Sequence, residues 1–127
     1  MNQNLSCFLF LFAFFGLAGC SDSKVAPVSG TITFDEQPLK NAKIVFQPKK
    51  GRASSAMTND QGYYELEYTV KEKGALIGTH KVRITTYQST DEKVSPELLP
   101  EKYHSKTTLS KEVKPGSNTI DFKLTSN

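Results

Sequence analysis

The stretch His80-Lys81-Val82-Arg83-Ile84-Thr85-Thr86-Tyr87 alternates along its whole length between two kinds of side chain. His80, Val82, Ile84 and Thr86 fall on one side, and charged or polar residues fall on the other. Successive side chains of a β-strand point to opposite faces of its sheet, so this pattern predicts one buried and one solvated face. Such a strand is typical of antiparallel sheets.

The same two-residue period recurs on both sides of this stretch. Residues 30–34, 42–47, 63–68 and 119–124 all alternate, and no apolar stripe persists at helical spacing. Turn-forming residues separate these runs, including 59–62 and a predicted hairpin turn at 115–118. Two weaker segments, 53–58 and 107–113, are expected to complete the sheets. The pattern therefore predicts an all-β sandwich of about seven antiparallel strands.

Residues 88–106 interrupt the alternation and contain Pro96 and Pro100. Long irregular segments in compact domains are often functional or disordered. We expect Leu98, Leu99 and Tyr103 to anchor this segment over an open end of the sandwich, and a ligand site is the alternative.

The first twenty residues contain an uncharged apolar run that ends in Leu17-Ala18-Gly19-Cys20. The run has about 14 residues, whereas a membrane span needs about 20, so it is typical of a signal-peptide core. The tetrapeptide resembles the lipobox of bacterial lipoproteins. This resemblance implies cleavage before Cys20 after its thiol has been joined to diacylglycerol. An ordinary signal peptide with a chance cysteine and a retained helical anchor are the alternatives.

These features predict three parts of the chain. Residues 1–19 are the signal peptide, residues 20–24 are the lipidated cysteine with a short tether, and residues 25–127 are one domain. No Lys or Arg precedes the apolar run, which leaves Met1 open as the true start. The predicted location is the bacterial cell envelope, either the periplasmic face or the cell surface, and the choice of membrane stays open.

The order of several short motifs resembles carboxypeptidase regulatory-like domains. Residues 28–34 and 37–48 are similar to the opening of these domains. Residues 58–64 are similar to the turn that leads into their aromatic strand, and residues 78–84 are similar to their Gly-x-x-x-Val strand. The ending from Pro100 to Phe122 is similar to small lipoproteins abundant in planctomycete-type bacteria. The resemblance implies a transthyretin-like or Ig-like Greek-key sandwich. It also implies a non-catalytic domain, because carboxypeptidases keep their zinc and catalytic groups in a separate domain.

Candidate chemistry in the predicted domain is sparse. His80 and His104 are the two histidines of the sequence, and Cys7 and Cys20 are its two cysteines. Cys7 would leave with the signal peptide and Cys20 would be lipidated, whereas a zinc site draws three or four ligands. We therefore expect no metal, no cofactor and no enzyme active site. His80 lies on the apolar side of its strand, where a hydrogen-bonded structural role is the favoured interpretation.

Charge suggests where a ligand would bind. The formal net charge is +3, too small and too dispersed for a nucleic-acid-binding face. Lys49, Lys50 and Arg52 crowd one loop, and Lys81 and Arg83 share an outward strand face. These side chains could meet acidic glycans or anionic lipid heads, or simply be solvated. The candidate ligand contacts are Lys49, Lys50, Arg52, Tyr103 and His104.

The sequence thus predicts a lipid-anchored, non-enzymatic envelope β-sandwich that acts as a binding or structural module. A glycan-binding or enzyme-accessory module at the cell surface is the alternative. The expected partners are the membrane, through lipidated Cys20, and an envelope protein or glycan that the sequence does not identify.

Overall fold

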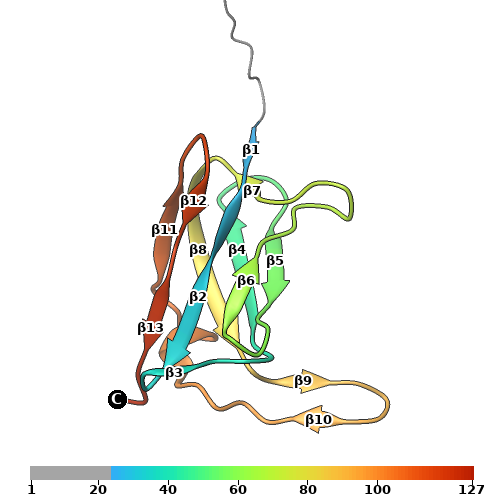
Figure 1. Cartoon of the computed structure of the whole chain (residues 1–127), viewed down its shortest axis with the longest axis vertical. Helices are drawn as coiled ribbons and strands as arrows, with labels where there is room; N and C mark the ends of the chain where they lie inside the picture. Colours follow the sequence, from blue (N-terminus) through green and yellow to red (C-terminus); the bar gives the residue numbers. More distant parts are fainter. Residues whose placement is uncertain (1–23) are drawn as a thin grey trace, which may run out of the picture.

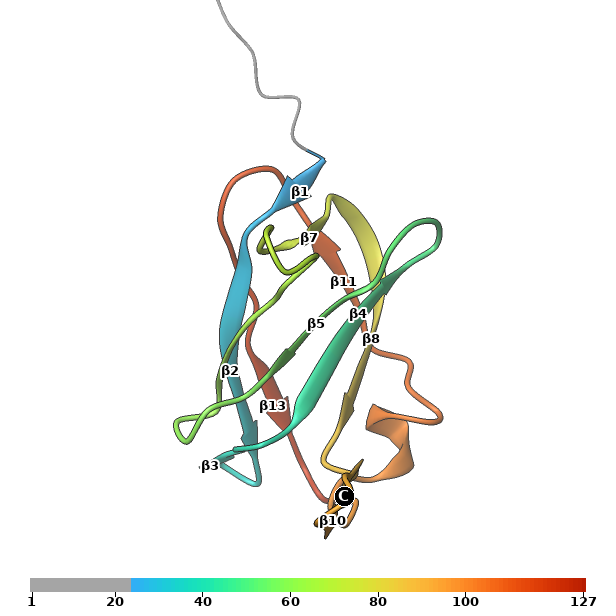
Figure 2. The ribbon, with the colours of Figure 1, turned by 90° about the vertical axis from the view of Figure 1, so that its right-hand side faces the viewer.

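In the computed structural model, the described residues are 24–127, and they form two β-sheets that pack face to face (Figures 1 and 2). The predicted signal peptide, residues 1–19, and the predicted lipidation site, Cys20, lie outside the described residues. Residues 24–127 contain no α-helix, and their single 3-10 turn, residues 101–103, is not long and apolar enough to cross a membrane. The predicted all-β sandwich is confirmed.

The first sheet is antiparallel throughout and has the order β11-β8-β4-β5. Its central strands, β8 (Gly78–Thr85) and β4 (Lys43–Pro48), place Ile44 beside Ile84 and Phe46 beside Val82. All four side chains are fully buried, which agrees with the predicted alternation. The flanking strands are β11 (Ser110–Val113) and β5 (Ser54–Met57), both within the weaker segments of the sequence.

The second sheet is built around β2 (Val28–Phe34). On one side, β6 (Tyr63–Glu65) and β3 (Gln37–Pro38) pair with it in antiparallel fashion. On the other side, β12 (Asn118–Thr119) and β13 (Phe122–Leu124) run parallel to it.

The prediction that all strands are antiparallel is therefore wrong for the two C-terminal strands, β12 and β13. The turn at 115–118 is also not a hairpin, because β11 and β12, on either side of it, belong to different sheets. Alternation encodes which face a side chain occupies and carries no information on strand direction. Gly30 permits the close parallel approach, since an added Cβ would lie 2.0 Å from the carbonyl oxygen of Ile120.

Two small ribbons complete the fold at opposite ends of the sandwich (Figure 1). At one end, β1 (Val25–Ala26) pairs with β7 (Ala75–Leu76), next to the point where the described chain begins. At the other end, β9 (Gln88–Ser89) pairs with β10 (Val94–Ser95), and the 3-10 turn η2 (Glu101–Tyr103) follows.

The core lies between the sheets and takes side chains from both. The ring of Phe46 lies 6.3 Å from that of Phe122 across the two layers, and Phe122 lies 6.3 Å from Tyr64. The Tyr64 hydroxyl donates a hydrogen bond of 2.5 Å to the Ile120 carbonyl, so the buried phenol keeps its polar atom satisfied. One apolar core therefore unites the two sheets.

The irregular segment is anchored largely as the sequence predicts. Leu99 is 5% exposed and Tyr103 is 8% exposed, so both pack against the end of the sandwich. The prediction is wrong for Leu98, which is 61% exposed. Its backbone instead holds the segment, through a 2.6 Å hydrogen bond from the Leu98 amide to Thr86 Oγ1.

Candidate functional site

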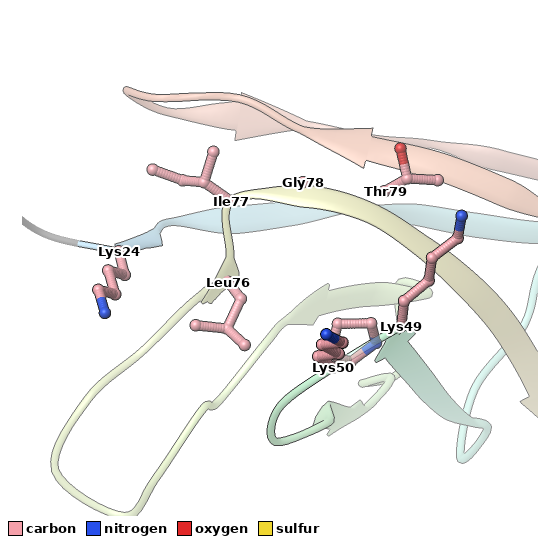
Figure 3. Close-up of a pocket in the computed structure, with 8 residues that line it drawn as sticks. Lys24, Lys49, Lys50, Leu76, Ile77, Gly78 and Thr79 are labelled. Carbon is pink, nitrogen blue, oxygen red and sulfur yellow. The ribbon is translucent and has the colours of Figure 1, made fainter.

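The clearest concentration of basic side chains surrounds the start of the described chain. Lys24 precedes β1, and its carbonyl accepts a 2.8 Å hydrogen bond from the Ile77 amide. The loop between β4 and β5 brings Lys49 and Lys50 to the same place. A shallow groove of about 600 Å³ lies among them, and Figure 3 shows the side chains of Leu76 and Lys50, which both line it. The groove is lined by Lys24, Pro48, Lys49, Lys50, Leu76, Ile77, Gly78 and Thr79.

Two contacts shape the loop that carries Lys49 and Lys50. Gly51 has φ 109°, and an added Cβ would lie 2.6 Å from a methyl carbon of Leu76, so a side chain there would be strained and obstructed. The Arg52 Nε donates a 2.6 Å hydrogen bond to the Tyr68 carbonyl. Arg52 therefore ties its own loop to Tyr68, the residue just before the loop at 69–73, while Lys49 and Lys50 are exposed to solvent.

Lys24, Lys49 and Lys50 make no ion pair within the described part of the chain. The ion pairs found there join Lys73 to Glu65 and Glu67, Lys106 to Glu101, and His104 to Glu97. A group of exposed lysines without carboxylate partners produces a local positive potential, which attracts anions.

The other predicted ligand contacts, Tyr103 and His104, lie at the opposite end of the sandwich (Figure 1). The Tyr103 hydroxyl accepts a 3.0 Å hydrogen bond from the Thr125 amide. Burial raises the pKa of this phenol, but the hydrogen bonds from Thr125 and the positive charge of Lys102 outweigh it and lower the pKa. The structure therefore does not bring the two predicted groups of contacts into one site.

His104 has a structural environment that its position in an irregular segment does not suggest. Its side chain is 18% exposed, and its Nε2 lies 3.0 Å from the Leu99 carbonyl. A carbonyl oxygen only accepts, so this nitrogen carries the proton. His104 is therefore largely packed against the irregular segment and hydrogen-bonded to it.

The same segment contains a carboxylate that sequence reasoning missed. Glu97 has a side chain only 22% exposed, and it accepts hydrogen bonds from the backbone amides of Thr86 and Leu99 at 2.9 and 3.2 Å. The hydroxyls of Thr85 and Thr86 also donate to it. A Glu between Pro96 and two leucines carries no pattern that predicts such a network.

His80 occupies the buried place that the alternation assigns to it. It is 1% exposed, its Nε2 lies 2.6 Å from the Leu76 carbonyl, and its ring lies 5.5 Å from that of Phe46. The predicted burial and hydrogen bonding of His80 are confirmed for Nε2, whereas its buried Nδ1 has no hydrogen-bond partner among residues 24–127.

The outward face of the four-stranded sheet is a second basic surface. Lys81 lies beside Gln47, Arg83 beside Val45, and Lys43 beside Thr85. The three cations point away from the core and form no ion pair among residues 24–127. Hollows of about 490 Å³ and about 380 Å³ lie beside Lys43 and Lys81, respectively.

Residues 24–127 contain no group of three or more His, Cys, Asp or Glu side chains placed to hold a metal ion. A comparison with models of known protein families and with curated proteins finds no match to this chain.

Proposed function

We propose that this protein is a lipid-anchored envelope β-sandwich that acts as a binding or structural module and performs no catalysis. The observation that carries the proposal is the short distance in sequence between Cys20, in its Leu-Ala-Gly-Cys setting, and the strand β1, which begins at Val25. The intervening residues reach at most about 17 Å when extended. A lipid on Cys20 would therefore hold the domain directly beside its membrane.

The form of attachment follows from the lipobox resemblance. One acyl chain binds a membrane only marginally, whereas two or more give stable anchoring. The modification implied for Cys20 supplies two chains on the sulfur and usually a third on the new amino terminus. Attachment would thus be firm without any membrane-spanning segment in the mature domain.

The test is a Cys20→Ala variant expressed in a bacterium that processes lipoproteins. We expect the wild-type protein to enter the detergent phase after phase separation and the variant to enter the aqueous phase. Mass spectrometry of the N-terminal peptide checks the diacylglycerol directly. Retention of the variant in the detergent phase would rule out this anchor.

Glycan binding is the second candidate, and the outward basic face of Lys43, Lys81 and Arg83 is the observation that favours it. Unpaired cations on a solvated sheet face suit an acidic polysaccharide, whose charges repeat along an extended chain. An intact protein that binds no acidic glycan on an array would dispose of this candidate and leave the anchor proposal unaffected.

A further inference from the structure

The end of the sandwich where the described chain begins carries more than the groove lysines. The loop at 69–73 contributes Lys71, and the turn between β11 and β12 contributes Lys114. The acidic residue in these loops is Glu72. We call this surface the basic end, and its residues are Lys24, Lys49, Lys50, Arg52, Lys71 and Lys114.

The opposite end has the reverse balance. Its turns and the irregular segment contain more acidic than basic side chains, and Figure 1 shows these segments gathered away from the start of the chain. The acidic residues are Asp35, Glu36, Asp60, Asp91, Glu92, Glu97 and Glu101, and the basic residues are Lys40, Lys93, Lys102 and Lys106. The domain is therefore electrically polarised along its long axis.

We propose that the basic end docks on anionic lipid headgroups of the membrane that holds Cys20, so that the domain stands with its acidic end outward. This inference rests on the proposed anchor, because Cys20 precedes Lys24 by only four residues. Four extended residues span at most about 14 Å, and electrostatic attraction persists over about 8 to 10 Å at physiological salt. The anchor thus holds the basic end close enough to the membrane surface for anionic headgroups to attract it.

Charge complementarity favours the orientation in which the basic end faces the anionic membrane surface. Anionic leaflets draw in basic residues near the surface, and each charge changes the binding equilibrium about fivefold. Tethering replaces a bimolecular encounter by an intramolecular one, so a few such contacts suffice to orient the domain. Orientation would otherwise be free, since a tether of this length permits the domain to tilt.

Exposed apolar side chains at the basic end are also suited to contact with a membrane surface. Val70, at the tip of the 69–73 loop, is 97% exposed, and Ile77 beside the groove is 40% exposed. Val70 is followed directly by Lys71, and exposed apolar side chains next to basic ones enter the boundary between headgroups and acyl chains. Val70 is therefore the residue we expect to lie deepest in the membrane surface.

Depth-dependent fluorescence quenching tests the docked orientation. The lipidated full-length protein, processed in cells and purified, is reconstituted into vesicles of phosphatidylcholine alone or of an equal mixture with phosphatidylglycerol. Val70→Cys and Val94→Cys each receive a fluorophore; both positions are exposed, and they lie at opposite ends of the domain. Headgroup-attached quenchers should quench the label at position 70 far more than that at position 94, and only in the anionic vesicles.

Matched charge variants complete the test. Lys49→Gln with Lys50→Gln should lower the ratio of docked to undocked molecules about 25-fold, since two charges are lost at about fivefold each. Lys40→Gln with Lys93→Gln removes the same charge from the opposite end and should leave quenching at position 70 unchanged. Equal effects of the two pairs would overturn the proposal.

The outcomes separate docking from anchoring. Vesicle association in both lipids, with equal quenching at positions 70 and 94, contradicts the docking surface and leaves the anchor intact. Association with neither kind of vesicle contradicts both. Quenching confined to position 70 in anionic vesicles supports the proposal.

Discussion

Glu97 shows how a single side chain can hold a segment that has no regular structure. Its carboxylate accepts hydrogen bonds from two backbone amides and two hydroxyls at the end of β8 and in the irregular segment. Partial burial raises the pKa of Glu97, but these hydrogen bonds together outweigh it and hold the pKa below the ordinary value. The ionised form therefore stabilises the fold.

This balance predicts the effect of pH on a Glu97→Gln variant. At neutral pH the substitution should lower the free energy of unfolding by about 2 kcal/mol, as expected for hydrogen bonds to a charged group. A depressed folded-state pKa stabilises the protein above the unfolded value, about 4.3, and this contribution is lost as the pH falls through the folded value. The difference between wild type and variant should therefore shrink below about pH 4.

Urea denaturation at neutral and acidic pH measures this difference. Glu101→Gln is the control, because the side chain of Glu101 is 64% exposed and its one ion pair within residues 24–127 is with the exposed Lys106. Its effect should stay below about 0.5 kcal/mol at either pH. A pH-independent loss in Glu97→Gln would show that size or packing, and not charge, explains its effect.

At the scale of elements, the irregular segment between β8 and β11 is attached to the sandwich by a small number of side chains. Leu99 and Tyr103 are buried against its end, while the β9–β10 ribbon projects away from it (Figure 1). Attachment therefore depends on these side chains and on the Glu97 network. The neighbouring pair Leu98 and Leu99 isolates the packing contribution, since the two residues are chemically identical and differ in burial.

We predict that Leu99→Ala lowers the free energy of unfolding by about 2 kcal/mol, the lower range for a buried leucine, because the site lies at the edge of the core. Leu98→Ala should change it by less than about 0.5 kcal/mol. Thermal and urea denaturation of both variants provide the measurement. Similar losses in the two variants would mean that the segment does not pack as described.

At the scale of the whole molecule, one core holds two sheets together. Phe46 of the first sheet is 0% exposed and contacts the ring of Phe122 in the second. No separate core serves either sheet alone among the described residues, because the buried apolar side chains form a single cluster. The domain should therefore unfold as one cooperative unit.

Phe46→Ala tests this cooperativity. The substitution should cost about 3 to 5 kcal/mol, and it should shift the transitions seen by far-ultraviolet circular dichroism and by tyrosine fluorescence together. Val45→Ala, on the outward side of the same strand, is the control and should cost less. Two separate transitions, with only one of them moved by Phe46→Ala, would show that the sheets unfold independently.

Period-two alternation was sufficient to predict the long strands and their buried faces, as at Ile44, Val82 and His80, but not the short ribbons β1–β7 and β9–β10. Turn-forming residues located the turn at 59–62, where the Asn59 side chain accepts hydrogen bonds from the Gln61 and Tyr63 amides. The parallel pairing of β13 with β2 could not be predicted, since a strand of either direction presents the same alternating faces. The exposure of Leu98 could not be predicted either, because two adjacent leucines in a loop have no periodicity to distinguish them.

The sequence alone determined the all-β class, the buried faces of the alternating strands such as β2, β4 and β8, and the crowding of Lys49, Lys50 and Arg52 in one loop. Those properties depend on the order of side chains along the chain, which local geometry converts directly into faces and turns. Only the tertiary structure decided that Lys24, the Lys49–Lys50 loop and Lys114 share one end, while Tyr103 and His104 lie at the other. Residues far apart in sequence become neighbours only when two sheets pack on one core, and no local pattern encodes that packing.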